Sequence, residues 1–220
     1  LLSMRLQQDP QLERAARLLM VPDLFNYWLT GVQVNEFTEA TTSQMYDPRR
    51  RQWAYPLLEQ LGIPVAMLGE VVPPGTILGP LHASVADEVG LPDVPVIAVA
   101  CHDTGSAVAA VPARAEHYIY ISSGTWSLIG IETPEPIINA RSLAYNFTNE
   151  GGVFGTYRFL KNIMGMWILQ ECRRIWASQD HAYSWDDITA LAAQAPAFGP
   201  LIDPDAHDFL QPGDMPARIQ

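Results

Sequence analysis

Apolar residues recur at helical spacing through the first ninety residues of the chain, with polar and charged residues between them. This period predicts four helices, over residues 4–20, 22–30, 53–61 and 85–89. Gly31 directly follows the second of these, where glycine is a suitable helix C-terminus. Residues 36–45 are polar and rich in Thr and Ser, which predicts a helix start or an ordered loop. The Pro and Gly content of residues 71–80 predicts an extended, irregular segment.

The pattern changes at residue 94, where a continuous apolar run replaces the helical period. Residues 94–101 read VPVIAVAC, which has the length and composition of a strand buried on both faces. The rest of the chain predicts strands over 118–122, 126–132 and 155–160, and helices over 106–111, 162–177 and 185–195. Strands interleaved with helices indicate an α/β class. We place a domain boundary near residue 93, which divides the chain into domains of residues 1–93 and 94–220.

The composition is that of a globular protein, with 48% hydrophobic and 17% charged residues in a chain of 220. The net charge is −11, and the 13 Lys and Arg residues are scattered. Their one dense run, Arg49–Arg51, follows Asp-Pro in a turn-like stretch, and we interpret it as a solvated loop. Proteins that bind nucleic acid normally carry a basic surface, so we expect no nucleic-acid partner.

Two cysteines, Cys101 and Cys172, lie far apart and form no CxxC pair, so neither a zinc site nor a disulfide framework is expected. We interpret both as buried thiols in a reducing compartment. No apolar run approaches the roughly 18 residues of a membrane span, and the chain start lacks a signal-peptide pattern. We therefore expect a cytoplasmic protein with no membrane partner. Because the chain starts at Leu1 and stops at Gln220 with no closing helix, we expect a piece of a longer protein.

A short polar segment, His102–Gly105, directly follows the apolar run. A carboxylate at this position stands at the carboxyl end of a strand, where open α/β sheets bind their ligands. Asp103 could act there as a general base, or it could cap the helix expected to start near Ser106. From position alone both interpretations stay open, and capping is the simpler one. His102 by itself fits a hydrogen-bonded structural residue better than an acid or base.

Three further polar segments are candidates for ligand binding. Ser122–Thr125 joins two expected strands, and its N–H and O–H groups could hold phosphate, although an ordinary hairpin turn explains the glycine equally well. Asn149–Gly152 indicates a turn before a strand. Asn162, at the expected start of the long helix, could contact a ligand or serve as the helix N-cap. Gln170, two turns further on, could be a surface residue.

Together these segments resemble the second domain of the FGGY family of carbohydrate kinases. The matching stretches are IAVACHDTGSAVAAV (97–111), YISSGTWSLIG (120–130), NFTNEGG (146–152) and YRFLKNIMGMWILQ (157–170). Residues 18–45 resemble the first domain of the same family. The most specific feature is the pair of His-Asp-Thr at 102–104 and Ser-Gly-Thr-Trp-Ser at 123–127. The resemblance covers nearly the whole chain and weakens after residue 178.

The resemblance implies an α/β protein with two domains of the ribonuclease-H-like, actin/hexokinase-type fold, here incomplete. The chain would span the later part of the first domain and the early part of the second. Members of the family transfer the γ-phosphate of ATP to a sugar hydroxyl with Mg²⁺, in the cleft between the domains. The wording of the motifs is similar to the branch of the family that phosphorylates L-rhamnulose at its 1-hydroxyl.

The resemblance also implies a role for particular residues. By position in the motif, Asp103 would be the base that accepts the proton of the sugar hydroxyl. The other implied contacts are His102, Thr104 and Asn162 with the sugar or the cleft wall, and Thr125 and Gln170 with ATP. No residue of the chain is assigned to the metal. The expected partners are thus a small-molecule sugar and ATP, and the oligomeric state is left open.

Parts of the family pattern are absent from this sequence, namely the acidic, glycine-rich phosphate motif and the later glycine-rich adenosine motif. We therefore expect that the chain cannot complete the reaction alone. One alternative is another specificity within the family, of the fuculokinase or xylulokinase type. A second is a non-catalytic fragment that binds sugar or nucleotide or mediates subunit contacts. An actin-like ATPase fits less well, because the His-Asp-Thr segment suits a sugar hydroxyl.

Overall fold

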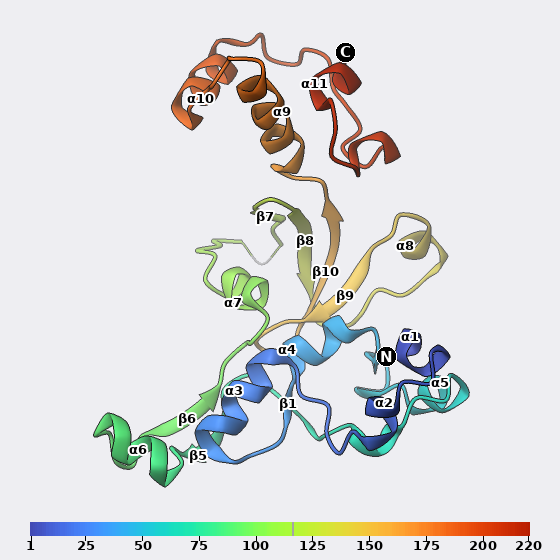
Figure 1. Cartoon of the computed structure of the whole chain (residues 1–220), viewed down its shortest axis with the longest axis vertical. Coiled ribbons are helices and arrows are strands. Elements are labelled where there is room, and N and C mark those ends of the chain that lie inside the picture. Colours follow the sequence, from blue (N-terminus) through green and yellow to red (C-terminus); the bar gives the residue numbers. More distant parts are fainter. Residues whose placement is uncertain (116) are drawn as a thin grey trace. The chain divides into compact units, whose positions relative to one another are not determined.

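The computed structural model describes residues 1–115 and 117–220, which form two compact units (Figure 1). The first unit comprises Leu1–Tyr118 and Ile131–Leu160, and the second comprises Ile119–Gly130 and Lys161–Gln220. Both units mix helices and strands, which confirms the predicted α/β class. The domain boundary near residue 93 stays a prediction.

The first unit begins with two short helices, α1 (Leu2–Leu6) and α2 (Pro10–Arg14), in place of the single helix predicted over residues 4–20. The sequence Asp9-Pro10 causes the break, because proline disfavours helical geometry at the residue before it. Pro10 lies at the start of α2, and the Asp9 carboxylate caps the new helix by accepting the Gln11 N–H at 2.9 Å. A strong local signal therefore overrides the longer apolar period.

The helices that follow end where the sequence predicts. Helix α3 (Val21–Thr30) stops at Gly31, which adopts φ 77°, and α6 (Ala83–Val89) stops at Gly90, with φ 67°. The remaining short elements of this part are α4 (Phe37–Ala40), η1 (Thr41–Ser43), α5 (Tyr55–Gln60), η2 (Val65–Met67), the parallel pair β1 (Asn35–Glu36) and β4 (Val71–Val72), and the hairpin β2 (Tyr46–Asp47) and β3 (Gln52–Trp53). Their buried core consists of Leu12, Ala40, Trp53, Leu58, Ile63, Met67 and Leu68.

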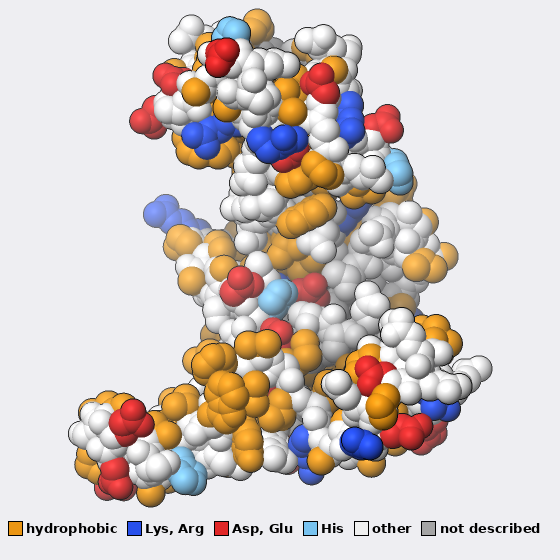
Figure 2. Space-filling model, viewed as in Figure 1, with side chains coloured by type: hydrophobic (Ala, Val, Ile, Leu, Met, Phe, Trp, Pro, Cys, Tyr) orange, Lys and Arg blue, Asp and Glu red, His pale blue; other side chains and the backbone are white. Residues whose placement is uncertain are grey.

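The apolar run at 94–101 forms a strand, but it is not buried on both faces as predicted. Strand β6 (Pro95–Ala98) pairs antiparallel with β5 (Thr76–Pro80) in a two-stranded sheet that contacts α3. Ile97 is 46% exposed and Val99 is 60% exposed. Figure 2 shows hydrophobic side chains gathered over this part of the molecule. The run thus belongs to a small two-stranded sheet, and the elements packed on this sheet do not cover Ile97 and Val99.

A second sheet has the strand order β7-β8-β10-β9. Strands β9 (Thr148–Gly151) and β10 (Tyr157–Ile163) pair antiparallel, as do β7 (Tyr120–Ser123) and β8 (Ser127–Thr133). The strands predicted over 118–122, 126–132 and 155–160 are thus present with shifted ends, whereas Asn149–Gly152 is mostly strand and not the predicted turn. The short helix α8 (Ala140–Ala144) precedes β9.

The second unit contains the C-terminal helices α9 (Trp167–Ser178), α10 (Trp185–Gln194) and α11 (Met215–Ile219), with the turn η3 (His207–Phe209) (Figure 1). Ser184 caps α10 by accepting the Asp187 N–H. The buried cluster of this unit consists of Met164, Ile168, Cys172, Phe209 and Met215. In the part of the chain that the structure describes, no helix combines the length and the apolar character needed to cross a membrane.

Candidate active site

The backbone at the end of the β6 segment is held by residues from much earlier in the chain. The fully buried Glu36 carboxylate accepts the Cys101 N–H at 3.0 Å, and Thr38 Oγ1 accepts the His102 N–H at 3.1 Å. Glu36 is itself fixed because it caps α4, where it accepts the N–H groups of Thr38 and Glu39. These contacts set the direction in which the chain leaves the strand and enters α7 (Asp103–Ala109).

A buried guanidinium anchors two side chains of the same segment. Arg158, fully buried on β10, places Nη2 2.7 Å from His102 Nδ1 and 3.0 Å from Glu150 Oε2. Its Nη1 donates to Thr104 Oγ1 at 3.0 Å, and its Nε donates to the Gly151 carbonyl at 3.0 Å. A buried charge is tolerated only when it is paired and hydrogen-bonded, and these partners meet both conditions.

Asp103 lies between the two anchored residues, and its carboxylate projects into solvent. Its side chain is 94% exposed, against 23% for His102, whose Nε2 lies 3.8 Å from Asp103 Oδ1. Helix α7 begins at Asp103 itself and not near Ser106, and His102 holds the N-cap position without a side-chain bond. Among the described residues, the Asp103 carboxylate accepts a hydrogen bond from the Thr104 N–H alone, at 2.6 Å. The capping interpretation is therefore wrong, and the carboxylate is free to accept a proton from a bound molecule.

Both cysteine thiols are protonated at neutral pH. Burial, reinforced by the charge of the nearby Glu36, raises the pKa of Cys101 to about 12, and burial also raises the pKa of Cys172. Because the thiolate is the reactive form, neither cysteine is a candidate nucleophile. Cys172 is buried as predicted, whereas Cys101 is only partly buried.

The Ser-Gly-Thr turn between β7 and β8 is attached to the start of α9 in the second unit. The carbonyls of Gly124 and Thr125 accept the N–H groups of Met166 and Trp167, at 3.0 and 2.8 Å. The Gly124 N–H donates to the Trp126 carbonyl within the turn, so it is not available to an anion. The structure brings two predicted residues together here, since Gln170 Nε2 lies 3.5 Å from Thr125 Oγ1. Both predicted nucleotide contacts thus belong to one local surface.

Asn162 does not lie at a helix start, as the sequence suggested. It is an exposed residue of β10, because the strand runs to Ile163 and α9 begins only at Trp167, with Met166 in the N-cap position. The N-cap interpretation of Asn162 is therefore wrong. The predicted site residues fall into two groups: His102, Asp103 and Thr104 in the first unit, and Thr125, Asn162 and Gln170 in the second.

The sequence interpretation missed four residues that build the first group, namely Glu36, Thr38, Glu150 and Arg158. Arg158 gave one usable signal, because it is a lone charge between aromatic residues in a strand-like stretch. Charged residues in such positions are buried only when they are paired. Nothing in the sequence indicated which residues would pair with it. Within residues 1–115 and 117–220, no group of three or more His, Cys, Asp or Glu could hold a metal ion.

Comparison with known families gives two adjoining matches. Residues 4–110 match the model of the FGGY family of carbohydrate kinases, N-terminal domain, and residues 119–220 match that of the C-terminal domain. A rhamnulokinase from Bacteroides thetaiotaomicron is 44% identical over 218 residues, which cover 99% of this chain and 44% of that protein. A rhamnulokinase from Oceanobacillus iheyensis is 45% identical over 209 residues, covering 95% and 43%. The chain spans less than half the length of these relatives.

Solved structures of sugar kinases share the fold. A ligand-bound xylulose kinase from Lactobacillus acidophilus superposes with a TM-score of 0.74 at 17% identity, over 88% of this chain and 39% of that one. A carbohydrate kinase from Novosphingobium aromaticivorans gives a TM-score of 0.62 at 27% identity, over 76% and 37%. These matches confirm the predicted actin/hexokinase-type α/β fold, represented here in part.

Proposed function

We propose, on the premise that this chain belongs to the FGGY family of carbohydrate kinases, that the complete polypeptide transfers the γ-phosphate of ATP to a sugar hydroxyl. The observation that carries the proposal is the exposed Asp103 carboxylate between two anchored neighbours. Phosphoryl transfer needs a positioned hydroxyl, a base and charge stabilisation, and little covalent work by the protein. The geometry at Asp103 suits the base.

The proposed sugar is L-rhamnulose, and the product is L-rhamnulose 1-phosphate. The names of the relatives that are 44% and 45% identical to this chain support this choice. Specificity for another sugar, of the fuculokinase or xylulokinase type, is the alternative. The xylulose kinase structure does not favour it, because a likeness at 17% identity concerns the fold alone.

In the proposed reaction, Asp103 accepts the proton of the sugar hydroxyl as the hydroxyl oxygen attacks the γ-phosphorus. The bond from that phosphorus to the bridging oxygen breaks, and ADP leaves with its electron pair. His102 and Thr104 hold the sugar from the anchored segment, and Asn162 supplies a further polar contact. Thr125 and Gln170 would contact the nucleotide.

Mg²⁺ is the expected companion of ATP in this proposal, since it would neutralise phosphate charge and is bound largely by phosphate oxygens and waters. The described residues offer no ligand cluster for it. No residue of this chain is therefore assigned to the metal, and no step of the proposed reaction is attributed to it.

The test is a phosphorylation assay of the complete polypeptide with ATP against a panel of ketoses that includes L-rhamnulose, L-fuculose and D-xylulose. We expect kcat/KM to be highest for L-rhamnulose. A higher value for another ketose would replace the proposed sugar and keep the reaction class. Absence of ADP formation with every sugar, from a folded protein that binds nucleotide, would favour the non-catalytic binding alternative.

A further inference from the structure

Arg158 on β10 is joined to several side chains and carbonyls of the first unit. Across the strands it lies directly opposite Glu150 in the register of β10 and β9. Its Nη2 faces His102 Nδ1 at 2.7 Å and Glu150 Oε2 at 3.0 Å, its Nη1 donates to Thr104 Oγ1, and its Nε donates to the Gly151 carbonyl. Because the side chain is fully buried, these donors need acceptors within the protein.

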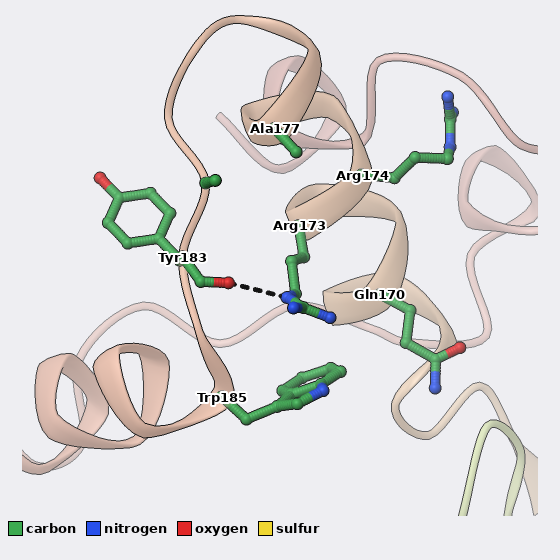
Figure 3. Close-up of a pocket in the computed structure, with 7 residues that line it drawn as sticks. Gln170, Arg173, Arg174, Ala177, Tyr183 and Trp185 are labelled. Atoms are coloured by element: carbon green, nitrogen blue, oxygen red, sulfur yellow. Dashed lines mark hydrogen bonds between the residues drawn. The ribbon is translucent and has the colours of Figure 1, made fainter.

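A second arginine, Arg173 on α9, shows how much less a guanidinium can be engaged. Its Nε donates to the Tyr183 carbonyl at 2.8 Å, and its Cζ lies 4.8 Å from the centroid of the Trp185 ring. Figure 3 shows the Arg173 and Trp185 side chains facing one another. The terminal nitrogens of Arg173 have no hydrogen-bond partner among the described residues. Both terminal nitrogens of Arg158, in contrast, are engaged, and they constrain the groups that accept from them.

The contact with Arg158 determines which nitrogen of the His102 ring carries the proton. A guanidinium can only donate, so a distance of 2.7 Å between Nη2 and Nδ1 requires a lone pair on Nδ1. The proton of the neutral ring is then on Nε2, since the hydrogen bond of one ring nitrogen sets the state of the other. Protonation of both nitrogens would place an N–H group and a second positive charge against the guanidinium.

Two other contacts of the ring do not change this assignment. Glu150 Oε2 lies 3.2 Å from Nδ1, but a proton on Nδ1 would face Nη2 of Arg158, which would then lose one acceptor in a buried site. Thr104 Oγ1 is almost equally far from the two ring nitrogens, at 3.3 Å from Nδ1 and 3.2 Å from Nε2. An oxygen so placed lies off both N–H axes, because these axes diverge, and it favours neither tautomer.

The Nε2–H group of His102 is thus left without a well-aligned acceptor beside the proposed base. Asp103 Oδ1 lies 3.8 Å from Nε2, which is longer than a hydrogen bond. The His102 side chain is partly exposed, so a bound molecule can reach it. A donor beside a carboxylate matches two neighbouring oxygens of a sugar, because one hydroxyl can donate to Asp103 while the next oxygen accepts from His102.

We propose that Arg158 is a positioning residue for the sugar: it holds His102 as the Nε2–H tautomer, whose N–H donates to a sugar oxygen next to the hydroxyl that reacts. The inference rests on the proposed function, which places the sugar at His102, Asp103 and Thr104. Arg158 acts through His102, because it is itself fully buried. The site then favours sugars that carry an acceptor oxygen beside the reacting hydroxyl.

The first test reads the tautomer in the unmodified complete polypeptide. Long-range ¹H–¹⁵N correlation spectra of protein labelled with ¹⁵N-histidine distinguish the protonated ring nitrogen from the bare one, and His102→Gln identifies the His102 signals. At pH 8 we expect the proton on Nε2, and a proton on Nδ1 would overturn the proposal. Arg158→Met should move the proton to Nδ1, because Glu150 Oε2 then becomes the nearest partner of that nitrogen. Arg14→Met, at an exposed arginine, should leave the tautomer unchanged.

The second test separates positioning from a general effect on structure. L-rhamnulose, or the ketose that the panel assay prefers to it, and ADP are titrated calorimetrically into the same proteins. Arg158→Met should raise the Kd of the ketose about tenfold and change the Kd of ADP by less than about twofold. Arg14→Met should change neither Kd, and melting curves establish that each variant is folded.

Unchanged ketose binding by folded Arg158→Met would overturn the proposal, as would an equal loss for the ketose and ADP. If Arg158→Met does not fold, the unmodified protein decides, because saturation with the ketose should shift the Nε2–H resonance of His102. An unmoved resonance would contradict the donor role. A proton on Nδ1 in an active kinase would remove this inference alone. A proton on Nε2 in a protein that phosphorylates no sugar would keep the link between Arg158 and His102 and remove the proposed function.

Discussion

The residues around Asp103 differ sharply in how they are held. His102 and Thr104 are tied to the buried Arg158, and the backbone before them is tied to Glu36, whereas the Asp103 carboxylate is exposed. A general base needs a backbone that is held in place and a carboxylate oxygen that is open to the substrate. The anchored neighbours of Asp103 provide the first, and its exposed carboxylate provides the second. The role of Asp103 in the proposed reaction is thus open to direct test.

Asp103→Asn in the complete polypeptide should lower kcat at least about 100-fold and leave sugar binding nearly unchanged. The amide has almost the same shape as the carboxylate but cannot accept the proton. The measurement is steady-state kinetics with L-rhamnulose and ATP, together with a sugar titration of the variant. Near-normal turnover would mean that Asp103 is not the base.

Arg158→Met should lower the free energy of unfolding by about 3–5 kcal/mol, because it removes the buried guanidinium that pairs with Glu150 and hydrogen-bonds His102. Denaturant unfolding of the 220-residue chain measures this loss. Arg14→Met is the control, since Arg14 is exposed and has no ion pair among the described residues, and it should change stability by less than about 0.5 kcal/mol. A loss below about 1 kcal/mol at Arg158 would show that the buried network contributes little.

At the scale of elements, most helix ends follow signals in the local sequence. The start of α9 depends in addition on tertiary contacts. Its start packs so closely on the β7–β8 turn that a Cβ at Gly165 would lie 2.6 Å from Ser127 Oγ and 2.7 Å from Ser127 N. Gly165 also adopts φ 53°, which favours glycine. Along the helix, Glu171 is buried and paired with Arg174. The orientation of α9 therefore depends on contacts that its own sequence does not reveal.

The Glu171 pair should make part of the stability depend on acid pH. The hydrogen bond from Arg174 holds the pKa of Glu171 below its ordinary value. The folded-state pKa is thus lower than the unfolded one, so the carboxylate stabilises the fold above the unfolded pKa. This contribution is lost as the pH falls through the folded-state pKa.

Glu171→Gln should therefore flatten the decline of the melting temperature between pH 7 and pH 3, and it should lower the melting temperature most at pH 7. Glu88→Gln serves as the control, because Glu88 is exposed on α6 and has no ion pair among the described residues. An identical pH profile for Glu171→Gln and the unmodified chain would contradict the expected linkage.

At the scale of the whole molecule, the chain matches both family domains but spans less than half the length of its rhamnulokinase relatives. The sheet of β5 and β6 leaves Ile77, Ile97 and Val99 substantially exposed. Phosphoryl transfer depends on holding both substrates and the metal in one geometry.

The isolated 220-residue chain should accordingly show no ATP-dependent phosphorylation of L-rhamnulose above background. A coupled assay of ADP formation measures this, with the complete polypeptide as the positive control under the same conditions. Robust turnover by a purified chain, abolished by Asp103→Asn, would show that the residues present here suffice for catalysis.

The sequence by itself determined the local features of this protein. Gly31 and Gly90 end helices, Ser184 begins one, and Asp9-Pro10 breaks one, because each of these effects acts within a few residues along the chain. The motif at 102–104 also marked the candidate site and the family, because motif residues are recognisable without their surroundings.

Only the tertiary structure decided what surrounds those features. The partners of Arg158, the anchoring of the Asp103 segment by Glu36, and the pairing of Arg173 with Trp185 join residues that are distant in sequence or belong to separate elements. The burial of β6 was mispredicted for the same reason, since a strand's exposure depends on which other strands and helices cover it. The burial of a side chain and the identity of its partners depend on how the whole chain packs. The apolar pattern indicates which residues tend to be buried, but it does not determine which residues they contact.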